Sequence, residues 1–191
     1  VFTIFKTIKS SDNESYNHNI SFKQSITFHN VNFTYGEDAP TLKDINLKLF
    51  CNENILIVGP SGSGKSTLLD LILGFTFPQS GEIFYDKMQI KMNDRDSVRN
   101  NFAFVPQKVL LIEGTLRENI LFGTNLSNKN NDFFNRVLSL SKLDEVIQSL
   151  PDGLDTIISD SNPILSGGQK QCLGFARAFF KNRDILVLDE A

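Results

Sequence analysis

The sequence predicts an α/β domain in which helices cover both faces of a parallel core sheet. Three observations support this fold class. The apolar run 55–58 is followed by a glycine-rich loop and then by an apolar helical pattern at 68–73. A second apolar run, 185–188, has the length of a buried strand. Strand-like and helical patterns alternate between these runs, which is the order expected of a parallel sheet.

The first part of the chain adds an antiparallel edge to this core. Residues 1–25 begin with apolar positions at helical spacing and continue with a polar stretch, so we expect the end of a helix and a linker there. The domain itself is expected to span 26–191. Alternation of apolar and polar residues predicts strands at 26–35 and 42–49, the first with a bulge near Asn30.

The remaining elements follow in order. Further strands are expected at 81–86, 101–105 and 185–188, and helices at 115–121, 132–149 and 166–180. The stretch 107–180 is mostly helical in pattern, so it is expected to form a helical lobe inserted between core strands.

The loop after the first core strand has the pattern of a phosphate-binding loop. It consists of Gly59, Pro60, Ser61, Gly62, Ser63, Gly64, Lys65, Ser66 and Thr67. Glycines let backbone N–H groups approach phosphate oxygens, and the following helix directs its positive end at the same anion. Lys65 can reach the β- and γ-phosphates, and the Ser66 hydroxyl can ligate Mg²⁺. An ordinary glycine-rich turn is the alternative, but the strand and helix around the loop favour nucleoside triphosphate binding.

The strand at 185–188 is followed by Asp189 and Glu190. At the carboxyl end of a core strand, Asp189 is expected to help hold Mg²⁺, and Glu190 to orient or deprotonate an attacking water. A strand that merely ends in an acidic turn is the alternative. The phosphate loop elsewhere in the chain favours the catalytic interpretation.

A second glycine-containing motif, Leu165-Ser166-Gly167-Gly168-Gln169, opens the predicted helix at 166–180. Ser166 is suited to cap this helix. Glycine in a helix costs about 1 kcal/mol relative to alanine, so two in the first turn call for an explanation. A capped, glycine-rich helix start can present N–H groups to an anion, although a plain turn before a helix would also fit.

Along the chain these three motifs occur at 59–67, 165–169 and 185–190. With them, residues from about 26 to 191 resemble the nucleotide-binding domain of ATP-binding cassette (ABC) transporters, a family of P-loop NTPases. The motifs match its Walker A, signature and Walker B sequences. The resemblance implies that Tyr35 stacks on adenine and that Gln107 contacts Mg²⁺ and the attacking water. It also implies that two such domains associate head to tail. ATP and Mg²⁺ then lie between the phosphate loop of one domain and the signature of the other (Ser166, Gly167, Gly168 and Gln169).

Two further segments, 113–123 and 150–156, resemble those of exporters in this family. The resemblance implies a membrane domain ahead of this domain in the same chain and a location at the cytoplasmic face of the plasma (inner) membrane. ATP hydrolysis would then drive export or flipping of a substrate. The sequence departs from the family pattern at Ser159-Asp160, where exporters usually have Gly-Glu, and at Cys172, where arginine is common.

Composition limits the alternatives. The net charge of −3 disfavours a nucleic-acid partner, and two cysteines suit a reducing compartment. A soluble ABC ATPase of DNA repair or translation remains possible, as does an ATP-binding module without turnover. The sequence ends just after Walker B, before the switch histidine and D-loop of the family. We therefore expect the 191-residue chain by itself to bind ATP but hydrolyse it poorly.

Overall fold

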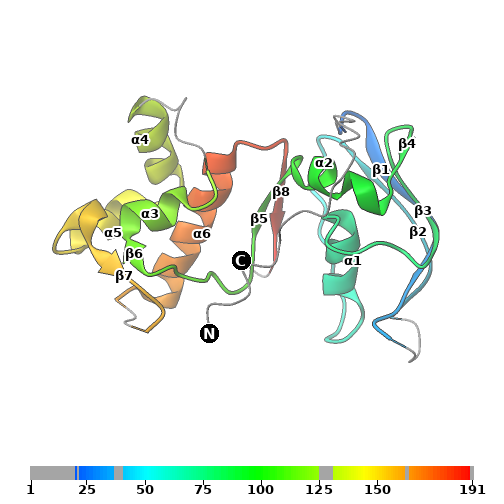
Figure 1. Cartoon of the computed structure of the whole chain (residues 1–191), viewed down its shortest axis with the longest axis horizontal. Helices are drawn as coiled ribbons and strands as arrows, with labels where there is room; N and C mark the ends of the chain where they lie inside the picture. The colour runs from blue at the N-terminus through cyan, green and yellow to red at the C-terminus, as the bar shows by residue number, and fades with distance from the viewer. Residues whose placement is uncertain (1–19, 21, 37–40, 125–130, 162–163, 190–191) are drawn as a thin grey trace. The chain divides into compact units, whose positions relative to one another are not determined.

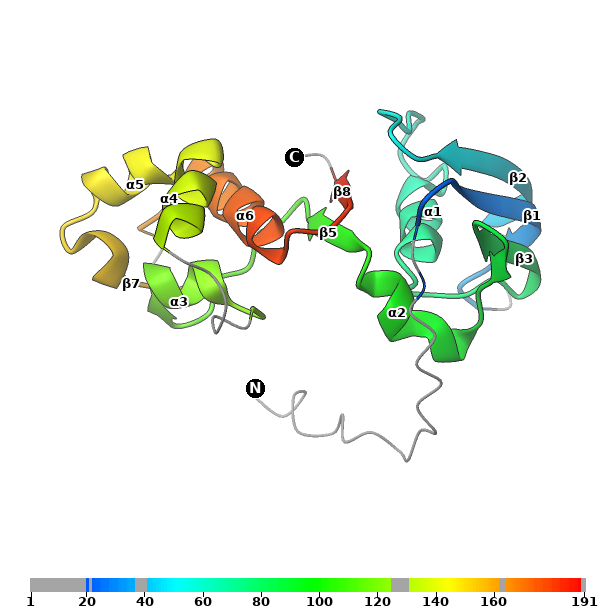
Figure 2. The same cartoon turned by 90° about the horizontal axis from the view of Figure 1, so that it is seen from above.

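The computed structural model describes residues 20, 22–36, 41–124, 131–161 and 164–189. The chain divides into two compact units, Val1–Arg99 and Asn100–Ala191, each with its own elements (Figures 1 and 2). The expected helix end within residues 1–10 lies outside the described residues, as does Glu190.

The first unit is built on an antiparallel sheet with strand order β2-β1-β3-β4. Its strands are β1 (Ser25–Phe33), β2 (Leu42–Phe50), β3 (Ser80–Tyr85) and β4 (Met88–Gln89). The three strands expected in this region, 26–35, 42–49 and 81–86, are thus confirmed. The antiparallel part is larger than expected, because β3 pairs with β1 and joins it.

The expected bulge in the first strand is also confirmed. The register of β1 shifts between Phe28 and Val31, and Asn30 adopts a left-handed φ of 47°. Gly81 on β3 faces this irregularity with φ +82°, and a Cβ there would collide with the carbonyl oxygens of His29 and Asn30. Glycine at 81 is therefore what lets β3 pair alongside the bulge.

Helix α1 (Lys65–Ile72) lies alongside this sheet (Figure 1). Its last turn buries Leu71 and Ile72, and the Tyr85 hydroxyl on β3 donates a hydrogen bond to the Ile72 carbonyl. The unit ends with a 3₁₀ turn, η1 (Met92–Asp94), and α2 (Arg95–Arg99). The sheet thus positions the helix that follows the phosphate loop.

The run 55–58, predicted as a core strand, has no ladder partner among the described residues of its own unit. Strand geometry needs a hydrogen-bonded neighbour. The apolar run alone therefore does not produce a strand in this unit.

The second unit contains the parallel pair that the sequence predicts. β5 (Phe102–Val105) pairs in parallel with β8 (Ile185–Leu188). The chain between them forms the expected helical lobe. Its elements are β6 (Gly114–Thr115), α3 (Leu116–Leu121), α4 (Asn131–Leu140), α5 (Leu143–Ser149), η3 (Gly153–Asp155), β7 (Ile157–Ile158) and α6 (Gly167–Lys181).

Helix α6 organises this lobe, since it contacts β5, α3, α4 and α5 (Figure 2). Its residues Leu173 and Phe180 are fully buried, together with Leu116, Ile120 and Leu143 of the neighbouring helices. In the described ranges, none of the helices combines the length and apolar character needed to cross a bilayer.

The helical pattern expected at 132–149 is confirmed, and it forms two helices rather than one. α4 ends at Leu140, and Lys142 takes a left-handed φ of 55° before α5 begins. The buried Ser141 hydroxyl donates to the carbonyls of Val137 and Leu138. Such bonding back to the preceding turn competes with helix continuation.

Asp86 anchors the start of β1. Its carboxylate accepts backbone N–H bonds from Lys23, Gln24 and Ser25 at 3.1, 2.8 and 2.9 Å. Burial by itself would raise the pKa of this carboxyl, but the three N–H donors outweigh burial and lower it. The carboxylate therefore stabilises the native state above the unfolded-state pKa, and this stabilisation disappears as the pH falls through the lower native value.

We expect Asp86→Asn to lower the free energy of unfolding by about 1 kcal/mol at pH 7, because an uncharged acceptor binds the three N–H groups less strongly. Asparagine tolerates the left-handed backbone at this position, where φ is 55°. Urea unfolding of wild type and variant between pH 7 and pH 3 measures the effect. A difference in stability that stays constant down to pH 3 would contradict it.

Candidate functional site

The backbone of the glycine-rich loop needs glycine at defined positions. Gly62 and Gly64 have φ of +79° and +88°. A Cβ at Gly64 would also lie 2.8 Å from Cδ2 of Leu42, and one at Gly59 would lie 2.7 Å from Oγ of Ser63. The loop therefore runs close to β2 and to itself, in a shape that other residues would disturb.

Helix α1 begins at Lys65, within this loop, and its start has no side-chain cap. Its N-cap is Gly64, which makes no side-chain capping bond, and the first turn contains no acidic residue. The Lys65 ammonium folds back and donates to the carbonyls of Gly59 and Pro60, both at 2.9 Å. An ammonium carries three N–H donors, so it retains capacity for a further acceptor. These features fit an anion such as a phosphate chain.

Candidate Mg²⁺ ligands are present, but they are few. Ser66 is exposed in the first turn of α1. Asp189 follows β8, and its N–H donates to the Val105 carbonyl at 3.0 Å, which fixes the backbone at this strand end. Nowhere in the described ranges do three or more His, Cys, Asp and Glu side chains form a cluster fit for a metal.

Tyr35, the predicted adenine contact, lies two residues after β1 and is 63% exposed. Its ring meets the buried Phe33 ring edge-on, with centroids 4.9 Å apart and an interplanar angle of 87°. Its hydroxyl donates to the carboxylate of Asp70 on α1 at 3.0 Å. The platform expected for a base is therefore open to solvent and in contact with the helix of the phosphate loop.

The predicted helix cap at Ser166 is confirmed. The Ser166 hydroxyl accepts from the Gln169 N–H at 3.3 Å, and the Gln169 side chain accepts from the Ser166 N–H at 2.8 Å. Gly167 and Gly168 behave differently from the loop glycines. A Cβ at either position would meet open space, and neither has a positive φ. Nothing in the described part of the chain therefore requires glycine at these two positions.

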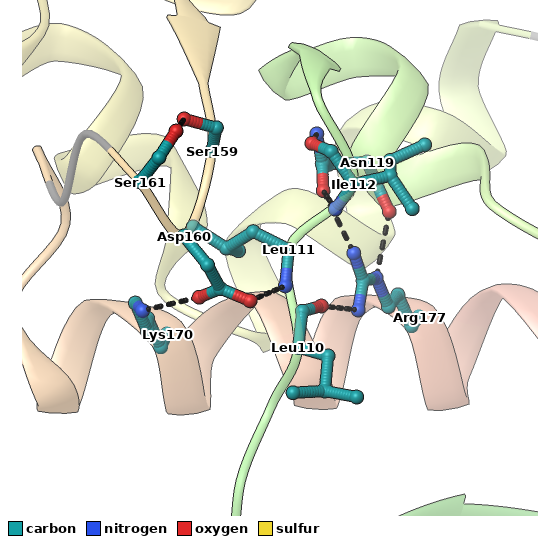
Figure 3. A network of polar contacts seen from close by, with 9 residues as sticks. All are labelled: Leu110, Leu111, Ile112, Asn119, Ser159, Asp160, Ser161, Lys170 and Arg177. Carbon is teal, nitrogen blue, oxygen red and sulfur yellow. Dashed lines mark hydrogen bonds and ion pairs between the residues drawn. The ribbon is translucent and has the colours of Figure 1, made fainter. Parts of the chain in front are cut away.

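A polar network fastens the segment after Gln107 to α6 (Figure 3). Arg177 donates to the Leu110 carbonyl at 2.7 Å, and to the backbone carbonyl and Oδ1 of Asn119 at 2.7 and 2.9 Å. Asn119 is fully buried and also binds the N–H and carbonyl of Ile112, both at 2.9 Å. The sequence analysis missed Asn119. The only signal was an amide within the predicted helix 115–121, beside Ile120.

Asp160, the residue that departs from the family pattern, belongs to the same network (Figure 3). It accepts from Lys170 on α6 at 2.9 Å and from the Leu111 N–H at 3.1 Å. The bond from Lys170 is the main cause that lowers the pKa of Asp160, and the Leu111 N–H adds to it. Gln171 on α6 donates to the Gln107 carbonyl at 3.0 Å. Gln107 and the start of α6 are thus linked through one connected set of contacts.

The expected site residues fall into two groups. Tyr35 and the loop 59–67 belong to the first unit, where Asp70 and α1 connect them. Gln107, the signature 166–169 and Asp189 belong to the second unit.

Comparison with known proteins assigns the family. The family model described as "ABC transporter" matches residues 42–191. The chain belongs to this family. It is 40% identical over 170 residues to an ATP-dependent lipid A-core flippase of Desulfotalea psychrophila, covering 89% of the chain. It is 38% identical over 195 residues to a putative export ATP-binding/permease protein of Rickettsia typhi, covering all of it.

The structural comparison agrees. A bacterial Atm1-family ABC exporter with ATP bound matches with a TM-score of 0.80 and 33% sequence identity over 87% of this chain. The fold is therefore that of an ABC nucleotide-binding domain, a P-loop NTPase fold with antiparallel and parallel sheets. The chain spans only 29% of that exporter, 29% of the flippase and 33% of the Rickettsia protein.

The open space at Gly168 leads to a prediction that separates stability from function. Gly168→Ala should raise the free energy of unfolding by up to about 1 kcal/mol, because alanine is the better helix former. If an outside group approaches this backbone, the same change should lower ATP turnover of the full-length protein about tenfold. Thermal unfolding and phosphate release measure the two effects. A stabilised variant with unchanged turnover would contradict the assignment.

The network around Arg177 leads to a second prediction. Arg177→Ala should lower the free energy of unfolding by about 2–4 kcal/mol, because it removes three charge-assisted bonds, two of them to the buried Asn119. Arg136→Ala, which removes an exposed arginine of α4, should change it by less than about 0.5 kcal/mol. Denaturant unfolding of both variants provides the comparison. Equal stabilities would show that the network contributes little.

Proposed function

We propose that this chain binds and hydrolyses ATP with Mg²⁺ and thereby powers transmembrane export or flipping of a substrate, as the nucleotide-binding part of an exporter-type transporter. The observation that carries the ATP assignment is the uncapped start of α1 with Lys65 folded onto the loop carbonyls. The names of the flippase, export and exporter relatives support the transport assignment.

The proposed roles follow the chemistry of each group. The loop 59–67 binds the phosphates, with Lys65 neutralising their charge. Ser66, Gln107 and Asp189 serve Mg²⁺, which would stabilise the charge that develops on the transferred phosphoryl group. Glu190 orients or deprotonates the attacking water. Tyr35 stacks on the adenine ring and leaves the polar edge of the base accessible.

We further propose that a second nucleotide-binding domain completes the site. Ser166, Gly167, Gly168 and Gln169 would contact the γ-phosphate of ATP held by the phosphate loop of that partner. The two exposed glycines without an internal structural need support this assignment. The other proposed partner is a membrane domain, which would keep this chain at the cytoplasmic face of the membrane.

Two alternatives predict different behaviour. A soluble ABC ATPase of DNA repair should show turnover that DNA stimulates, whereas a binding module should bind ATP without releasing phosphate. The exporter assignment requires that ATP turnover and substrate movement across a bilayer depend on each other. Reconstitution of the full-length protein into vesicles, with and without added DNA, distinguishes the three.

Two substitutions should separate ATP binding from hydrolysis. Lys65→Ala should weaken ATP binding about 10- to 100-fold, because a charge-assisted contact to phosphate is lost. Glu190→Gln should preserve ATP binding but slow phosphate release at least about 100-fold. Equilibrium binding and phosphate release on the full-length protein measure both, with Lys43→Ala, an exposed lysine of β2, as control. A Glu190→Gln variant with normal turnover would remove that residue from the mechanism.

A further inference from the structure

The surroundings of Tyr35 are more restrictive than its exposure suggests. An exposed tyrosine ordinarily samples several rotamers, and a ligand that stacks on it must overcome the loss of that freedom. Here two contacts limit the ring although 63% of the residue is exposed. Phe33, itself only 6% exposed, meets the ring at 87°, and Asp70 holds the hydroxyl at 3.0 Å.

The second contact comes from the helix that follows the phosphate loop. Asp70 lies in α1 five positions after Lys65, about 7.5 Å along the helix axis. Thr67, three residues before Asp70 and on the same face of the helix, also hydrogen-bonds the Tyr35 hydroxyl. One helix thus begins at the proposed phosphate site and, one turn later, holds the tip of the proposed base platform.

The bond to Asp70 acts on the tip of the ring and not on its stacking surface. The hydroxyl lies at the far end of the ring, so a bond there fixes ring orientation without covering its faces. Partial burial is the main cause that raises the pKa of Tyr35; the Thr67 bond opposes this rise, and Asp70 adds to it. The hydroxyl is therefore protonated at physiological pH and donates to the carboxylate.

We propose that Asp70 is a positioning residue for nucleotide recognition. By accepting the Tyr35 hydroxyl bond, it holds the ring in a fixed orientation before a planar base stacks on it. This inference rests on the proposed function, in which Tyr35 is the platform for adenine. The gain is preorganisation, because the ring's rotational freedom is lost on folding and not on ATP binding.

Dissociation constants of the full-length protein for MgATP and for magnesium tripolyphosphate test the proposal. Tyr35→Phe keeps the ring but removes the hydroxyl, and Asp70→Ala removes the acceptor. Each should raise the constant for MgATP about 3- to 10-fold. The double variant should be no weaker than either single one, since both remove the same bond. Asp70→Asn retains an acceptor oxygen and should bind MgATP nearly as wild type does.

Tripolyphosphate provides the matched control ligand, because it has the phosphates but no base. Its affinity should be unchanged in all these variants. Glu53→Ala removes an exposed carboxylate from the same unit and should leave both affinities unchanged. If Asp70→Ala weakens tripolyphosphate as much as ATP, Asp70 acts through α1 or the loop, and the positioning role is overturned.

Tyr35→Ala tests whether Tyr35 contacts the base at all, which is the part of the proposed function on which this inference rests. If Tyr35→Ala leaves ATP affinity unchanged, Tyr35 is not a base platform and both proposals fail. If Tyr35→Ala weakens ATP binding while Tyr35→Phe and Asp70→Ala do not, the platform stands and the positioning role of Asp70 is overturned. Additive effects of the two single substitutions would also overturn it.

Discussion

The unsatisfied N–H groups in the first turn of a helix are the constraint on which this chain depends, and its two principal helices meet it differently. α6 begins with a reciprocal capping box between Ser166 and Gln169, so its start is satisfied by its own side chains. α1 begins at Gly64 with no side-chain cap. A phosphate chain can satisfy these donors, so in the proposed site the helix that lacks a side-chain cap would bind the anion.

The same contrast explains the two kinds of glycine. In the phosphate loop, Gly59, Gly62 and Gly64 are required by backbone conformation or by close approach within the unit. In the signature, Gly167 and Gly168 have neither reason. Because glycine weakens a helix start, retaining two of them is favourable only if something else uses the exposed backbone. In the proposed site, a partner would contact this exposed backbone. That would explain why a well-capped helix keeps two glycines that lower its stability.

The polar network around Arg177 has a different consequence. Buried polar groups are costly unless every partner is satisfied. Arg177 and Asn119 bond to each other and to the backbone of Leu110 and Ile112. Asp160 bonds to Lys170 and to the Leu111 N–H. The segment after Gln107 therefore has little independent freedom relative to α6. A displacement of either element would be transmitted to the other, which is the physical basis for coupling within this unit.

Most of the fold could be predicted from the sequence because its signals are local. The bulge at Asn30, the cap at Ser166 and the strands β1, β2, β3, β5 and β8 follow from alternation, capping chemistry and apolar runs. The errors arose where the outcome depends on partners distant in sequence. The run 55–58 has strand composition but no ladder within its unit. The end of α4 is different, because Ser141 bonds to carbonyls only three and four residues before it. Asn119 went unnoticed because its role depends on Arg177, 58 residues away.

The first unit contains separate groups for phosphate and for base, and this separation bears on which nucleoside triphosphate the proposed site would select. In the proposed site, Lys65 and the start of α1 would contact phosphates, which all nucleoside triphosphates share. Stacking on Tyr35 is tolerant of base identity, because every base presents a π-face. Its polar tip, the group able to read a base edge, is already bonded to Asp70. The described residues of this unit therefore favour a triphosphate with some planar base, and strict selection of adenine would need donors or acceptors contributed from elsewhere.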